Sequence, residues 1–200
     1  MKRVELLAPA KDLYTAKVAI EAGANAVYLG GKNFGARFFA TNLENEDLKE
    51  AVLFAHTRGA KVYVTVNTIV YQYEWNQLIE YLDYLSKIDV DAIIVQDLGV
   101  LYYVRSKYPH MEVHASTQMN IYNERGLEIL NHLGVKRVVL ARETSLEMIK
   151  KLKNQEIELE VFVHGALCFC ASGNCLMSYA IGNRSGNRGK CAQPCRKTYT

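Results

Sequence analysis

Five cysteines, all of them beyond residue 167, are the residues of this 200-residue chain best suited to chemistry. A thiolate acts as a nucleophile, pairs in a disulfide, or ligates a metal ion or an iron–sulfur cluster. A nucleophile needs one thiolate and a base, and His164 lies near enough in the sequence to be that base. Further thiols add nothing to such a mechanism. Four of the cysteines follow the spacing C-x₆-C-x₁₅-C-x₃-C, namely Cys168, Cys175, Cys191 and Cys195.

Disulfide bonds are the least suitable use of these cysteines. An odd number of thiols cannot pair completely within one chain. The opening residues, MKRVELLAPAKD, lack the apolar core of a secretory signal, and no stretch reaches the roughly 20 apolar residues of a membrane span. We therefore expect a cytoplasmic protein without a membrane segment, in which thiols stay reduced.

Thiolates on irregular, glycine-rich backbone favour a 4Fe–4S cluster, because the ligands of such clusters tolerate uneven spacing. Structural zinc sites instead use closely spaced cysteine pairs. Only Cys168 with Cys170 and Cys191 with Cys195 come near such spacing. The spacing alone favours an iron–sulfur centre, and zinc and a catalytic or unligated thiol remain alternatives.

A basic, glycine-rich stretch overlaps the last two cysteines. It reads RSGNRGKCAQPCR from residue 184 to residue 196 and contains no acid, within a chain of net charge +3. Such a loop is typical of phosphate or carboxylate binding, although a solvated surface loop has the same composition. The candidate ligand-binding residues are Arg184, Arg188, Lys190 and Arg196.

Short apolar runs alternate with helical segments along the chain and predict an α/β fold. The expected strands are 4–9, 25–30, 61–67, 91–97, 112–118, 136–142 and 158–165; the expected helices lie near 12–23, 44–58, 74–88, 98–107, 123–133 and 144–154. Continuous apolar strands are typical of a parallel sheet buried on both faces. Seven strands and six helices predict a TIM-barrel-like (β/α)₈ fold that is one strand short, with an open doubly wound sheet as the alternative.

Local signals predict the ends of these helices. Gly23, Gly59 and Gly134 stand where helices should stop. Thr144 and Glu147 have the spacing of a capping box. The expected helix N-caps are Asp12, Thr68, Asp97 and Thr144.

Polar residues at the carboxyl ends of the strands are candidates for catalysis, because the active site of either fold lies there. Gln96, Gln118, Arg142 and His164 stand at strand ends and are poor helix caps. Arg37 lies in the loop GGKNFGARFFATN, where it could clamp a carboxylate, stack on a base, or cover a surface loop. The catalytic candidates are Arg37, Gln118, Arg142 and His164.

The stretch ELEVFVHGALCFCASGNCLMS resembles the signature of the peptidase U32 family, which is also called the collagenase-like protease family. The matching positions are Glu160, Phe162, Gly165, Ala166, Leu167, Cys168, Gly173, Cys175, Met177 and Ser178. The stretches ELLAPA, AIEAGANAVYLGG and HASTQMN are similar to that family as well, so the resemblance covers nearly the whole chain.

The resemblance implies an iron–sulfur protein that hydroxylates without molecular oxygen. Some family members make 5-hydroxyuridine in tRNA, others make 5-hydroxycytidine in 23S rRNA, and prephenate is implicated as the oxygen donor. The resemblance places the cluster on Cys168, Cys175, Cys191 and Cys195 and leaves Cys170 as a spectator. It implies RNA and prephenate as partners, and we expect Arg37 and Arg142 to bind the dicarboxylate.

Two other functions stay open, a U32 collagenase-like peptidase and a non-catalytic iron–sulfur scaffold. The sequence contains neither HExxH nor GxSxG. His56, His110 and His132 are expected on the surface and His114 in the core. We expect βα repeats over residues 1–165 and a cysteine-rich segment of the same domain over 166–200. Because one strand is missing, we expect the chain to be the amino-terminal part of a longer protein.

Overall fold

Seven parallel strands form one sheet in the computed structural model, which describes residues 4–32, 34–36, 43–152 and 156–198. Each strand pairs with the next one along the chain, in the order β1-β2-β3-β4-β5-β6-β7. The strands are β1 Leu7–Pro9, β2 Ala26–Leu29, β3 Lys61–Val66, β4 Ala92–Val95, β5 Glu112–Ala115, β6 Arg137–Val139 and β7 Glu158–Glu160.

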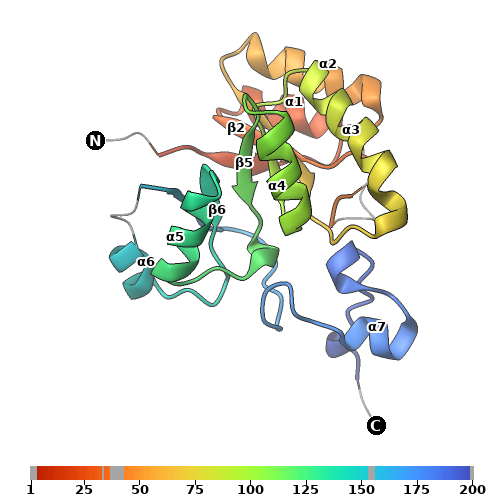
Figure 1. Ribbon diagram of the computed structural model, residues 1–200, viewed down its shortest axis with the longest axis vertical. Coiled ribbons are helices and arrows are strands. Elements are labelled where there is room, and N and C mark those ends of the chain that lie inside the picture. Colours follow the sequence, from red (N-terminus) through yellow and green to blue (C-terminus); the bar gives the residue numbers. More distant parts are fainter. Residues whose placement is uncertain (1–3, 33, 37–42, 153–155, 199–200) are drawn as a thin grey trace.

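The sheet curls into a half-barrel with helices on its outer side (Figure 1). The uninterrupted strand order is that of a (β/α)₈ barrel, whereas a doubly wound sheet reverses its order at a switch point. The predicted TIM-barrel-like class is confirmed, and the doubly wound alternative is wrong. The helices between the strands are α1 Leu13–Glu21, α2 Asn45–His56, α3 Trp75–Lys87, α4 Leu98–Lys107, α5 Glu124–His132 and α6 Leu146–Leu152.

The main apolar core lies between the sheet and its helices. Leu82 of α3, Ile93 of β4 and Leu101 of α4 are fully buried in it. All four residues of β4 are buried, as expected for a strand covered on both faces. A smaller apolar group that includes Tyr63 and Ile94 belongs to the other face of the sheet.

A network of charged residues accompanies this smaller group, around Arg137 at the start of β6. Arg137 Nη1 lies 2.6 Å from Glu5 Oε1, and Arg137 Nη2 lies 2.8 Å from Glu158 Oε2. The Tyr63 hydroxyl donates to Glu5 at 2.9 Å. Although burial alone would raise it, the pKa of Glu5 lies below its ordinary value because Arg137 and Tyr63 bind the carboxylate. The network joins the residues before β1 to β6 and β7.

Most of the predicted helix ends are confirmed. The Asp12 side chain accepts from the backbone N–H of Thr15, and the Asp97 side chain accepts from the N–H groups of Gly99 and Val100. The three glycines expected after helices have positive φ angles, at Gly23, Gly59 and Gly134.

Two of the predicted caps are wrong. Ser145 caps α6, since its hydroxyl accepts from the Met148 N–H, while the Thr144 hydroxyl donates to the Ala141 carbonyl. A threonine shifted by one position cannot reach the first turn of that helix. The Thr68 hydroxyl is buried and donates to the Phe34 carbonyl, so it joins two loops.

The histidines lie where the sequence predicts. His114 is fully buried, with its ring edge against Tyr63 and its Nε2 atom 3.6 Å from Glu112, beyond hydrogen-bond range. Burial lowers the pKa of His114, which favours the neutral ring. The three histidines that the sequence predicts on the surface are exposed, namely His56, His110 and His132.

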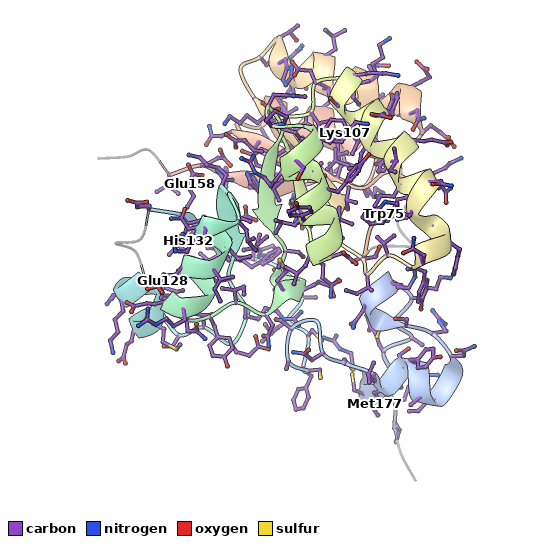
Figure 2. All side chains as sticks on the ribbon, in the orientation of Figure 1. Trp75, Lys107, Glu128, His132, Glu158 and Met177 are labelled. Carbon is purple, nitrogen blue, oxygen red and sulfur yellow. The ribbon has the colours of Figure 1, made fainter. Side chains whose placement is uncertain are left out.

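The cysteine-rich segment follows β7 and is mostly irregular. It holds the short helix α7 Met177–Gly182 and the 3₁₀ turns η3 Gly186–Arg188 and η4 Pro194–Arg196. Figure 2 shows Met177 below the start of α3 at Trp75. Glu158 lies at the upper left of the same view, away from Met177. Among the described residues, no helix is both long and apolar enough to cross a membrane. The expected division of the chain at residue 165 stays a prediction.

Candidate active site at the carboxyl ends of the strands

A cavity of about 1050 Å³ opens at the carboxyl ends of the strands. Its walls come from the loops after β3, β5, β6 and β7 and from the cysteine-rich segment. Gln118, Arg142 and His164 all line it, so the fold brings these three predicted candidates together. The side chain of Gln96 is buried beside it and donates to the Gln118 carbonyl at 3.5 Å. Arg37 lies outside the described residues.

All five cysteines line this same cavity and none is in a disulfide: Cys168, Cys170, Cys175, Cys191 and Cys195. The Cys170 thiol lies beside the Cys175 thiol, and this neighbour raises the pKa of Cys170. The predicted spectator therefore lies directly beside a predicted ligand.

The donor set fits an iron–sulfur cluster by its chemistry. Soft thiolates are the ligands that such clusters use, and the cysteine-rich segment brings them to one cavity wall. Close packing joins its two halves, since a Cβ atom on Gly186 would lie 3.6 Å from Cys191 Cβ and 3.8 Å from the Cys175 carbonyl. In the part of the chain that the structure describes, no three His, Cys, Asp or Glu side chains converge to hold a metal ion. The cluster stays a prediction.

The first cysteine loop, residues 168–175, is anchored on the loop after β6. The Glu143 carboxylate accepts from the Ser172 backbone N–H at 2.8 Å and from its hydroxyl at 3.1 Å. Burial would raise the pKa of Glu143, but its own backbone N–H and Ser172 hold that pKa below the ordinary value. Arg142 Nη2 donates to the Cys170 carbonyl at 3.3 Å. The loop is therefore held by backbone contacts that leave its thiols on the cavity.

Gly173 fixes this loop against the turn after β5. Its φ is +70°, and a Cβ atom there would lie 2.1 Å from the Gln118 carbonyl oxygen. An alanine at this position meets both left-handed strain and a backbone clash. The structure thus gives a physical reason for the signature glycine between Cys168 and Cys175.

We predict that Gly173→Ala releases the first cysteine loop and costs about 2 kcal/mol or more of folding stability. Hydrogen exchange read by mass spectrometry should show lost protection in peptides over residues 165–180. Gly182→Ala is the matched control, because Gly182 ends α7 and a Cβ atom there would have nothing within 4 Å. Equal protection in both variants would contradict this account of the loop.

The second cysteine loop, residues 191–195, is tied to the first by arginine and serine contacts. Arg196 Nη2 donates to the Leu167 carbonyl at 2.9 Å, beside Cys168. The Ser178 hydroxyl accepts from the Ala192 N–H at 2.9 Å. Arg184 Nε donates to the Lys190 carbonyl at 2.9 Å. These contacts hold the segment's own backbone.

Arg188 docks the segment on the barrel. Its guanidinium forms an ion pair with Glu74 and donates to the Ile69 carbonyl at 2.6 Å. Arg184, Arg188 and Arg196, which are predicted to bind phosphate or carboxylate, thus make structural contacts. Sequence reasoning missed Glu74, the partner of Arg188, because a single acid far away in the chain carries no local signal.

Two polar atoms on the cavity have no hydrogen-bond partner among the described residues. Arg142 Nε and Glu160 Oε2 are buried and make no hydrogen bond there, although Arg137 lies 3.5 Å from the Glu160 carboxylate. Burial raises the pKa of Glu160, which favours its protonated form. In the sequence, Glu160 stands out only as a signature position. A free guanidinium N–H beside a carboxyl group of raised pKa is suited to a polar, acidic ligand.

The fold and the site together define the class of this protein as a parallel βα half-barrel with a cysteine-lined cavity at the carboxyl ends of its strands. The family model "Peptidase family U32" matches residues 11–200. The chain therefore belongs to the peptidase U32 family, as its signature predicts.

Two curated relatives and one solved structure are similar to the chain. It is 44% identical over 199 residues to a 23S rRNA 5-hydroxycytidine synthase of Escherichia coli, covering 99% of the chain and 30% of the relative. It is 42% identical to tRNA hydroxylation protein P1 of Bacillus subtilis, covering 99% of the chain and 47% of the relative. The chain thus spans less than half the length of either one. The structure of the U32 peptidase Mk0906 matches with a TM-score of 0.67 and 16% identity, over 80% of this chain and 68% of that one.

Proposed function

We propose that this protein hydroxylates a pyrimidine base of tRNA or 23S rRNA without molecular oxygen, with prephenate as the oxygen donor. The observation that carries the proposal is the cavity that combines five free thiols with the unpaired Arg142 Nε. The names of the two curated relatives, an rRNA hydroxycytidine synthase and a tRNA hydroxylation protein, support RNA as the substrate.

The cavity has room for the reactants that this function needs. A volume of about 1050 Å³ is at the upper end for small-molecule sites and would take a nucleobase together with a small dicarboxylate. An enzyme that modifies a base must take that base out of its stack and enclose it. We propose that Gln118 binds the polar edge of the base and that His164 stands at the rim.

Four thiolates would hold a 4Fe–4S cluster in this proposal, namely Cys168, Cys175, Cys191 and Cys195. When bound, the cluster supplies redox or Lewis-acid chemistry next to the donor. Arg142 donates to a carboxylate of the donor through Nε, while Nη2 keeps its contact with the Cys170 carbonyl. The Glu160 carboxyl group, whose pKa burial raises, faces the donor from the cavity wall.

We predict that deleting the gene removes 5-hydroxyuridine from tRNA or 5-hydroxycytidine from 23S rRNA, and that the wild-type gene restores it. Arg142→Ala should lower the restored fraction by about tenfold or more, since a charge-assisted contact contributes about 1.5–3 kcal/mol. Mass spectrometry of digested RNA measures both results. Arg125→Ala, an exposed arginine of α5, should restore the wild-type level.

Two other functions give different results in these measurements. The name of the matching family and the name of the solved relative, U32 peptidase Mk0906, favour a peptidase. Cleavage of casein or collagen by the purified protein, together with unchanged nucleosides in the deletion strain, would support it. A non-catalytic iron–sulfur scaffold would carry a cluster, leave RNA nucleosides unchanged and cleave neither protein.

A further inference from the structure

Two exposed tyrosines lie at the 3₁₀ turn η1, Gln72–Glu74, just before α3: Tyr71 precedes the turn and Tyr73 is in it. The rings of Tyr71 and Tyr73 stack with centroids 5.4 Å apart and planes 16° apart. The Tyr73 ring contributes nothing to the core, because the residue is 80% exposed. A rigid, solvent-facing aromatic pair is suited to binding a flat ligand.

The pair is held in place by the same contacts that dock the cysteine-rich segment. The Tyr71 N–H donates to Glu74 Oε2 at 2.9 Å, and Arg188 Nη1 lies 3.0 Å from that oxygen. The Arg188 guanidinium also lies 4.7 Å from the centre of the Tyr71 ring. Burial would raise the pKa of Glu74, but Arg188 and the Tyr71 N–H keep it below its ordinary value. The pair is thus fixed by an ionised Glu74 at neutral pH.

The position of the pair relates it to the cavity. Gly186 and Asn187 line the cavity, and the next residue, Arg188, contacts Tyr71. The tyrosines therefore lie beside the cavity wall, next to the basic stretch that begins at Arg184. Aromatic faces beside cationic side chains are the usual arrangement for single-stranded nucleic acids, whose bases stack while their phosphates meet positive charge.

We propose that Tyr73, backed by Tyr71, stacks on an unpaired nucleobase of RNA that adjoins the base entering the cavity. This inference rests on the proposed function, because a base drawn into the cavity brings its neighbouring nucleotides to the rim. Stacking on tyrosine is tolerant of base identity. The pair therefore contributes affinity for unpaired RNA and leaves the choice of target base to the cavity.

Binding of two fluorescein-labelled probes to the purified protein tests the platform, with anisotropy as the readout. One probe is decauridylate, and the other is an abasic ribose-phosphate chain of equal length. We expect Tyr73→Ala to weaken decauridylate binding about tenfold, as loss of one stacked base should do, and to leave the abasic probe unaffected. Tyr73→Phe should bind like the wild type, because the ring does the stacking.

Tyr102→Ala is the matched control, since Tyr102 is 72% exposed in the middle of α4. Its affinity should equal that of the wild type. Wild-type affinity for decauridylate in Tyr73→Ala would overturn the platform and leave the proposed function standing. Equal weakening for both probes would overturn stacking in favour of a charge effect. Failure of the wild type to bind decauridylate would also overturn the platform, whereas the nucleoside measurement decides the proposed function separately.

Discussion

Replacement of any one of Cys168, Cys175, Cys191 and Cys195 by alanine is expected to remove the iron–sulfur cluster. Each variant loses a thiol that we propose as a cluster ligand and that backbone contacts hold at the cavity. Anaerobically purified wild-type protein should contain about four iron atoms and four sulfides per chain and absorb in the visible range. Each variant should contain less than about one iron atom, and its gene should fail to restore hydroxylated nucleosides.

Cys170→Ala is the matched control for these variants, because Cys170 lines the same cavity and lies beside Cys175. Its iron and sulfide content should equal that of the wild type. If Cys170→Ala loses the cluster while one of the other variants keeps it, the ligand set is wrong. A colourless wild-type protein that binds one zinc ion per chain would contradict the cluster itself and support the zinc alternative.

Arg137→Ala is expected to destabilise the fold by about 3 kcal/mol, the lower end of the effect of breaking a buried ion pair. Arg137 is 10% exposed, and its removal leaves the carboxyl groups of Glu5, Glu158 and Glu160 close together without the guanidinium that joins them. We expect the lower end of that range because the Glu158 side chain reaches solvent, where water stabilises its charge. The free energy of unfolding from urea titration, at constant m-value, measures the change.

Arg125→Ala serves as the control for charge removal, since its ion pair with Glu128 lies on the surface of α5. Exposed pairs contribute little, so the urea midpoint should stay close to that of the wild type. Arg137→Lys should recover part of the loss, because lysine restores the charge without the forked geometry that binds two carboxylates. A midpoint in Arg137→Ala equal to that in Arg125→Ala would contradict the structural role of the network.

Much of the fold could be predicted from local patterns. The seven apolar runs become seven strands, although each strand is shorter than its run, because only part of each run pairs with a neighbouring strand. The helix 98–107 and the caps Asp12 and Asp97 are correct, since capping needs only contacts within one turn. The predicted cap at Thr144 is wrong by one residue. Thr144 and Ser145 both have a hydroxyl that could cap the helix, and only the path of the backbone selects Ser145.

The candidate site could be predicted in part. The sequence correctly places Gln118, Arg142 and His164 at the carboxyl ends of strands, because parallel strands all end at one edge. The composition of the basic stretch predicts phosphate or carboxylate ligands. That prediction stays untested, and the structure adds contacts that composition does not reveal: Arg188 binds Glu74, which lies 114 residues away in the chain, and Arg196 binds the Leu167 carbonyl. Composition shows the charge of a side chain but not its partner.

The sequence by itself determined the family, the alternation of strands and helices, and the concentration of thiols after β7, because these depend on neighbours along the chain. The tertiary structure decided which groups meet. Gly173 rests on the Gln118 carbonyl, Glu143 holds Ser172, and Tyr71 lies under Arg188. Each contact joins loops that are remote in the chain and become neighbours only when the half-barrel brings the carboxyl ends of its strands to one side.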